Sequence, residues 1–198
     1  MSNYQFAPMF PMDAENHAFV TWCNGFSEQE LIALEIYCEK NLEVTEGTVG
    51  YNNLDSQIRK SKTGWIKNDP ETAWFYDRMA FIARKLNSQF YRFDLYGFVE
   101  DFQYTVYDGT EDGYYDWHID MGANAVTTRK FSLVLQLTDP SEYEGGDLQI
   151  MNGNQIQTVD KCRGFVVGFP GFVLHKVTPV TKGIRKTIVI WVAGPPFR

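Results

Sequence analysis

The chain has 198 residues, of which 44% are hydrophobic and 16% aromatic, and its formal net charge is −7. This length fits one domain with a substantial core. The negative charge argues against nucleic acid as the main partner, and the absence of any apolar run of roughly 20 residues argues against a membrane span. Residues 1–22 do not resemble a secretory signal, and the three cysteines contain no CxxC pair, so we expect reduced thiols in a cytoplasmic protein.

The first half of the chain, to about residue 97, is dominated by helical signals. Ser27 can cap a helix and Glu30 can complete a capping box, which predicts a helix to about Lys40. Asp69 followed by Pro70 is a favourable start for a second helix. Apolar side chains then recur at helical spacing, at Phe75, Met79, Ile82 and Leu86. We interpret both helices as supporting scaffold.

The second half of the chain, about 98–194, is typical of short strands separated by turn residues. Strands are predicted near 102–107, 130–137, 146–150, 155–159, 164–168, 172–178 and 185–193. This pattern favours an antiparallel double-sheet jelly roll. We therefore predict an α+β fold in one domain over 1–198, with a double-stranded β-helix (jelly-roll) core and N-terminal supporting helices.

A histidine and an aspartate two residues apart form the first candidate metal motif. In extended chain residues i and i+2 point to one side, so His118 and Asp120 converge while Ile119 turns away into apolar surroundings. His175 is the best third ligand, because His17 lies in a Pro- and Met-rich stretch. Two histidines and a carboxylate suit Fe(II) oxygen chemistry, although zinc can use the same set. HxD alone is also compatible with an ordinary histidine beside a turn.

Arg185 is the candidate anion-binding residue. A Lys182-Gly183 turn between two strands would bring Arg185 beside the strand of His175. Alternation puts Lys186 on the outer face and, on the inner face, Arg185, Thr187, Val189 and Trp191. A buried guanidinium is costly unless an anion meets it, and its fork matches a carboxylate. A dicarboxylate that chelates the metal at its other end would supply this anion, and a buried ion pair with Asp or Glu is the alternative.

Together these motifs resemble the prolyl-hydroxylase-type branch of the 2-oxoglutarate/Fe(II)-dependent oxygenase superfamily. The family pattern is HxD, a distant His and then an Arg or Lys, here His118, Asp120, His175 and Arg185. Animal collagen-type relatives usually carry Lys at the last position. The resemblance covers about residues 98–194, and it extends more weakly to Arg59-Lys60-Ser61. The surrounding matches are Tyr107 before a Gly-rich turn, Tyr115, Gly145-Gly146-Asp147-Leu148, Val177, Pro179, Val180 and Trp191.

The resemblance implies a dioxygenase that needs Fe(II), 2-oxoglutarate and O2, with ascorbate as a supporting reductant and with succinate and CO2 as co-products. It assigns His118, Asp120 and His175 to the metal and Arg185 to the far carboxylate of 2-oxoglutarate. Three further residues have two readings. Tyr107 would add a hydrogen bond to that carboxylate or would be a core tyrosine. Gln136 would line the same pocket or reach solvent at the sheet edge. Trp191, like Arg129, matches a substrate-facing position in some relatives, or it is barrel core.

The substrate is open at this point. The prolyl-hydroxylase branch implies hydroxylation of a prolyl residue in a peptide or protein. The same chemistry on a free amino acid or small metabolite fits the motifs equally well. A non-catalytic jelly-roll binding or structural module and a zinc hydrolase are the alternatives from other classes. The sequence leaves the oligomeric state open.

Overall fold

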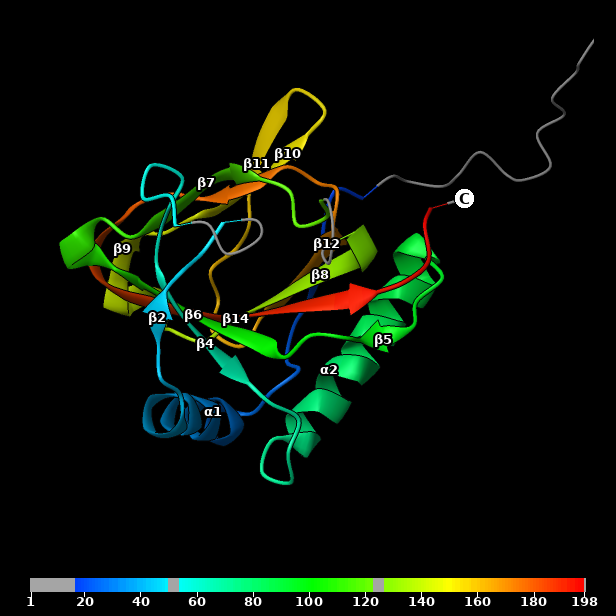
Figure 1. The fold of residues 1–198 in the computed structure, drawn as a ribbon, viewed down its shortest axis with the longest axis horizontal. Coiled ribbons are helices and arrows are strands. Elements are labelled where there is room, and N and C mark those ends of the chain that lie inside the picture. The colour runs from blue at the N-terminus through cyan, green and yellow to red at the C-terminus, as the bar shows by residue number, and fades with distance from the viewer. Residues whose placement is uncertain (1–16, 50–53, 123–126, 198) are drawn as a thin grey trace, which may run out of the picture.

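The computed structural model describes residues 17–49, 54–122 and 127–197, and within them two antiparallel sheets face each other (Figure 1). The major sheet has the order β1-β12-β8-β14-β6-β4-β2, and β5 and β9 also pair with β14. The minor sheet has the order β11-β10-β13-β7-β3. This is the predicted double-stranded β-helix. The strands from the front half are β1 (Val20–Trp22), β2 (Thr45–Glu46), β3 (Arg59–Lys60), β4 (Lys62–Ile66) and β5 (Gly97–Phe98).

The remaining strands come from the second half of the chain. Seven of the nine overlap a predicted strand, although β14 begins five residues before the predicted strand 185–193. They are β6 (Phe102–Asp108), β7 (Tyr114–His118), β8 (Arg129–Gln136), β9 (Tyr143–Gly145), β10 (Leu148–Asn152), β11 (Gln155–Thr158), β12 (Val166–Pro170), β13 (His175–Val177) and β14 (Val180–Ala193). The two strands that were not predicted are β7 and β9. The predicted strand 146–150 starts only at Leu148, because Gly145 and Gly146 have φ angles of +75° and +61° that interrupt extended chain.

Two helices cover the outer face of the major sheet, on the side away from β7, β10 and β11 (Figure 1). Helix α1 (Glu28–Asn41) has the predicted capping box, in which the Ser27 amide donates to Glu30 at 2.8 Å and the Glu30 amide donates to Ser27 Oγ at 3.3 Å. Helix α2 (Ala73–Leu86) begins later than predicted. The Asp69 carboxylate accepts the amides of Glu71 and Thr72, so the segment first forms a separate turn. A π-helical turn (Asn87–Tyr91) follows α2.

The apolar core has two parts, one on each face of the major sheet. Between that sheet and the helices lie Phe75, Met79, Phe102, Ile188 and Ile190. Between the two sheets lie Tyr107, Leu148, Ile150, Phe169 and Val177. Alternation along β14 serves both parts, because successive side chains point to opposite faces. No helix of the described residues is long and apolar enough to cross a membrane.

The predicted hairpin around Lys182-Gly183 is wrong. Strand β14 runs through both residues, and β9 pairs with it there, with Gly183 opposite Tyr143. Strand β13, which carries His175, pairs with β10 and β7 in the other sheet. The dipeptide resembles a turn because Gly183 has a φ of +73°. Here that glycine instead lies within a long strand that bears a bulge.

Candidate metal centre

The three predicted metal ligands lie together between the sheets. His118 ends β7, Asp120 follows two residues later, and His175 opens β13, opposite His118 in the antiparallel pair. Their ligand atoms all lie within 4.8 Å of one another. His118 Nε2 lies 3.9 Å from Asp120 Oδ1, and His175 Nε2 lies 3.7 Å from Asp120 Oδ2. Ile119 does turn away from them, but it is 46% exposed, so the expected apolar surroundings are wrong.

Backbone carbonyls fix the orientation of both imidazoles. His118 Nδ1 lies 2.7 Å from the Asp116 carbonyl oxygen, and His175 Nδ1 lies 2.9 Å from that of Val173. A carbonyl can only accept, so each Nδ1 carries the proton and donates it. Each Nε2 is then left with a lone pair that faces Asp120. This is the tautomer that a metal-binding histidine requires.

The protonation states fit a divalent cation. Burial, together with the neighbouring His175, lowers the pKa of His118 to about 3, so this imidazole is neutral at neutral pH. Burial alone would raise the pKa of the Asp120 carboxyl, but His175, His118 and a hydrogen bond hold it below the usual range. That bond comes from Ser132 Oγ, which donates to Asp120 Oδ2 at 2.6 Å. A buried carboxylate beside the neutral His118 imidazole leaves a negative charge that a metal ion would compensate.

Arg185 lies inside the barrel, as predicted from the alternation of side chains along the strand. It is 3% exposed, and its Nε has no hydrogen-bond partner among the described residues. Its Cα lies opposite that of Tyr107 on β6, and the guanidinium carbon is 5.4 Å from the Tyr107 ring centre. Lys186 points outward, where it pairs with Glu39 of α1. The described residues therefore provide no carboxylate for Arg185 Nε, and the ion-pair alternative loses its support.

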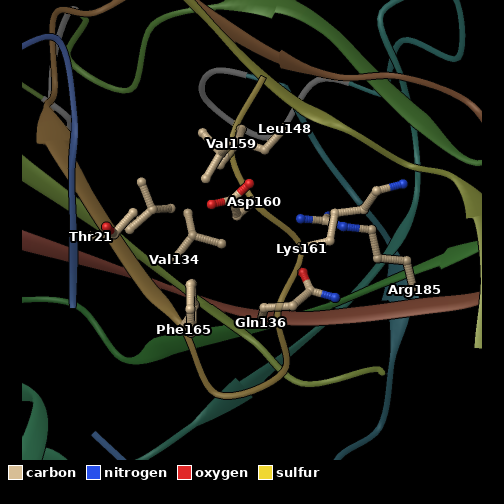
Figure 2. Close-up of a pocket in the computed structure, with 10 residues that line it drawn as sticks. Thr21, Val134, Gln136, Leu148, Val159, Asp160, Lys161, Phe165 and Arg185 are labelled. Carbon is tan, nitrogen blue, oxygen red and sulfur yellow. The ribbon is translucent and has the colours of Figure 1, made fainter. Parts of the chain in front are cut away.

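A cavity adjoins Arg185 (Figure 2). Figure 2 shows Arg185, Gln136 and Lys161 on one side of it, with the apolar Val134, Leu148 and Val159 and the carboxylate of Asp160 among the other lining residues. The amide nitrogen of Gln136 already donates to the Thr138 carbonyl at 3.0 Å and to the Tyr143 hydroxyl at 3.1 Å. The cavity thus combines an unpartnered cationic group with an apolar wall, which suits a small carboxylate ligand.

One strand connects this cavity with the metal triad. Ser132, Val134 and Gln136 alternate along β8 and face the barrel interior. Ser132 is bonded to Asp120, whereas Val134 and Gln136 line the cavity at Arg185. The two ends of this row are on the order of 13 Å apart, since alternate strand residues advance about 6.7 Å. A short dicarboxylate could lie along this row between the metal and Arg185.

Comparison with known proteins agrees with this geometry. Residues 102–193 match the model of the 2OG-Fe(II) oxygenase superfamily. This segment, which covers slightly less than half of the chain, is similar to that superfamily. A PKHD-type hydroxylase of Pseudomonas fluorescens is 40% identical over 91 residues, which are 41% of this chain and 39% of the relative. A similar relative from Pseudomonas aeruginosa is 36% identical over 88 residues, with the same coverage. The match therefore spans about two fifths of these relatives' length.

The fold of the oxygenase core is shared with solved structures. A Trichoplax adhaerens prolyl hydroxylase, in complex with a peptide fragment of hypoxia inducible factor, has a TM-score of 0.74 at 18% identity, with 89% of this chain and 84% of that chain covered. A Pseudomonas putida prolyl-4-hydroxylase has a TM-score of 0.71 at 19% identity, with 90% and 94% covered. At identities this low, the similarity shows the shared jelly-roll fold and no more.

Beside the triad of this oxygenase core lies an Arg–Trp pair. Trp191 lies opposite Ser132 in the sheet, and the guanidinium carbon of Arg129 is 3.5 Å from its ring centre. Arg129 is held by Glu100, whose Oε1 accepts from its Nε at 2.7 Å. Trp191 Nε1 is buried and has no partner among the described residues. Glu100, Ser132 and Lys161 were not predicted from the sequence, because their contacts depend on strand pairing and not on local spacing.

Proposed function

We propose that this chain is a 2-oxoglutarate and Fe(II) dependent dioxygenase that hydroxylates a prolyl residue in a peptide or protein. The observation that carries the proposal is the convergence of two imidazole Nε2 atoms and the Asp120 carboxylate, with the unpartnered Arg185 Nε in the same barrel. A zinc hydrolase would not require a buried, unpartnered guanidinium. A purely structural module would not require three metal-ligand side chains with both imidazoles in the metal-binding tautomer.

Each proposed role follows from an atom in place. His118 Nε2, His175 Nε2 and one Asp120 oxygen would hold Fe(II) and leave about three coordination positions open. When bound, Fe(II) supplies the oxidative decarboxylation of 2-oxoglutarate to succinate and CO2 with O2, coupled to hydroxylation. Arg185 would hold the far carboxylate with a charge-assisted hydrogen bond. Tyr107, the neighbour of Arg185, is the proposed second contact.

Two further roles complete the co-substrate site. Gln136 lines the cavity, but its amide hydrogens are already donated to Thr138 and Tyr143, so it would shape the pocket without a hydrogen bond to the co-substrate. Ser132 holds one lone pair of Asp120, which fixes how the carboxylate faces the metal. The valine and leucine side chains give the cavity an apolar part that would limit the access of water and side reactions.

The substrate proposal rests on the Arg129–Trp191 pair next to the triad. Arg129 would donate to a backbone carbonyl of the peptide, and the buried indole of Trp191 would hold the guanidinium in place. Similar relatives carry the name PKHD-type hydroxylase, and two similar structures are prolyl hydroxylases, one with a bound peptide. A cytoplasmic setting belongs to the same proposal, because Cys23, Cys38 and Cys162 are all free.

Succinate formation from 2-oxoglutarate tests the activity without knowledge of the substrate. The assay contains Fe(II), ascorbate and O2, and it compares wild type with His118→Ala. We expect slow succinate release from wild type that requires iron and is lost in the variant. If wild type and variant both stay silent while each binds neither Fe(II) nor 2-oxoglutarate, the proposal is wrong.

The same chemistry on a free amino acid or small metabolite is the second candidate. The two differ in what accelerates succinate release. Proline-containing peptides should stimulate wild type and should gain the mass of one oxygen atom in the prolyl hydroxylase case. Stimulation by free amino acids, with unchanged peptides, would transfer the proposal to the small-molecule alternative.

A further inference from the structure

The His118 imidazole lies flat on an aromatic ring. The ring centres of His118 and Tyr115 are 3.5 Å apart, and their planes differ by 11°. Tyr115 belongs to the same strand, β7, and lies opposite Arg59 of β3 in the antiparallel pair. The guanidinium carbon of Arg59 is 4.6 Å from the Tyr115 ring centre. The phenol ring therefore contacts the imidazole by stacking and the guanidinium by a cation–π contact.

Arg59 is firmly anchored although it comes from the front half of the chain. It is 7% exposed, and each guanidinium nitrogen has its own acceptor. Nε donates to Ser61 Oγ at 2.7 Å, Nη1 to the Thr48 carbonyl at 3.0 Å, and Nη2 to Gln103 Oε1 at 3.0 Å. Thr105 Oγ1 donates to the same Gln103 oxygen at 3.2 Å, which fixes that acceptor in turn. No carboxylate takes part in these bonds, so this arginine is held by neutral acceptors.

The stack constrains a motion that the hydrogen bond leaves free. The bond from His118 Nδ1 to the Asp116 carbonyl fixes one edge of the ring but allows the plane to tilt about that edge. Tyr115 prevents the tilt, because a parallel ring at 3.5 Å is already in van der Waals contact. His175 has different support, since it is 5% exposed and its ring packs 4.6 Å from Phe169. His118 lies on the more open side of the triad and depends more on the stack.

We propose that Arg59, acting through Tyr115, is a positioning residue that holds the His118 imidazole in its metal-binding orientation. This inference rests on the proposed function only in requiring that the triad binds a divalent metal. It assigns residues outside the matched segment 102–193 a part in the metal site. It also predicts that Tyr115 acts as a flat ring and not through its hydroxyl, because its contact with His118 is made face to face by the two rings.

The test measures the affinity of the apoprotein for Co(II), by titration of its visible absorption, in four variants. We expect Arg59→Gln and Tyr115→Leu each to weaken binding by about 10- to 100-fold, the range for residues that orient metal ligands. Tyr115→Phe keeps the ring and should bind like wild type. The double variant Arg59→Gln/Tyr115→Leu should lose no more Co(II) affinity than the weaker-binding single variant, because both changes remove the same support of the His118 ring.

A matched control is available on β7 and β13, the two strands that carry His118 and His175. The Lys176 ammonium lies 4.8 Å from the Trp117 ring centre, a cation–π contact between β13 and β7 that does not include the triad. Lys176→Gln should therefore leave the Co(II) affinity and the Co(II) spectrum unchanged. If Arg59→Gln fails to fold, Arg59→Lys replaces it, since a single ammonium cannot meet three acceptors arranged around a planar fork. It should also weaken Co(II) binding.

The possible outcomes separate the two proposals. If wild type itself does not bind Co(II), the metal site and the proposed function fail. If wild type binds and the Arg59 variants match Lys176→Gln, the positioning role of Arg59 is wrong. Equal affinities of Tyr115→Leu and Tyr115→Phe would likewise overturn the part assigned to the ring. Additive losses in the double variant would show that Arg59 acts by a route that does not pass through Tyr115.

Discussion

Ser132 donates a 2.6 Å hydrogen bond to the Asp120 carboxylate from the same strand whose next inward side chains line the cavity at Arg185. Strand β8 thus links a metal ligand to the proposed co-substrate pocket. The bond is fully buried, because Ser132 is 0% and Asp120 8% exposed. Removal of this bond therefore tests how strongly the orientation of the Asp120 carboxylate affects metal binding.

Ser132→Ala should weaken Fe(II) binding by about 10- to 100-fold, because the carboxylate loses the bond that orients it. The measurement is an anaerobic Fe(II) titration. Ser141 provides a matched control, since its hydroxyl makes the same 2.6 Å bond to Asp139 on an exposed turn. Ser141→Ala should bind iron like wild type. Equal iron affinities of both variants would show that the Ser132 bond has no part in the metal site.

Arg185→Ala should raise the 2-oxoglutarate requirement by about 100-fold, which corresponds to about 3 kcal/mol for a charge-assisted bond. Its iron affinity should stay close to that of wild type, because Arg185 is not a ligand. The apparent KM for 2-oxoglutarate in succinate release and the Kd for Fe(II) measure the two effects. Lys186→Gln is the control, because Lys186 is the cationic residue next to Arg185 in the sequence and faces α1 outside the barrel. Equal losses in both quantities for Arg185→Ala would contradict its assigned role.

Arg129→Gln should abolish most of the stimulation of succinate release by proline-containing peptides and leave the slow release without peptide unchanged. The reason is that Arg129 contacts Trp191 and Glu100 and does not contact a metal ligand in any described bond. Arg78 provides the control, since it also lies over an aromatic ring, that of Phe26, and pairs with Glu30. A loss of the basal release in Arg129→Gln would place this residue in the metal site instead.

Cys38 should make stability fall at high pH. Burial raises the pKa of its thiol from 9.0 to about 12 in the folded protein. Above about pH 9 the unfolded chain releases this proton while the folded chain retains it, so the contribution is complete below pH 9 and is lost as pH rises. The expected slope approaches about 1.4 kcal/mol per pH unit. Urea unfolding of wild type and Cys38→Ala between pH 8 and about pH 10 measures the difference.

Alkylation provides an independent check of the same burial. Iodoacetamide should modify Cys23 and Cys162 of the folded protein, because both are exposed, and should modify Cys38 only after unfolding. Rapid modification of Cys38 under native conditions would contradict the burial that shifts its pKa. A parallel pH profile of wild type and Cys38→Ala would contradict the shift itself.

Local rules predicted those features that depend on neighbours in sequence. The capping box of α1 formed as expected, because both partners lie within one helical turn. Side-chain alternation placed His118 and Asp120 together and turned Arg185 inward, because the period of an extended strand is a property of the backbone. The start of α2 was predicted too early, since Asp69 formed a tighter turn with the next residues.

Residue identity and side-chain alternation were therefore enough to predict the chemistry that this chain offers, namely two histidines, an aspartate and an inward arginine. Which strands pair with one another became clear only in the assembled barrel. It placed His175 opposite His118, seated β9 against Gly183 where a turn was predicted, and brought Arg59 onto the ring beside His118. The physical reason is that strand pairing joins segments far apart in the chain, and the partner of each strand is selected by the packing of the whole barrel and not by its own residues.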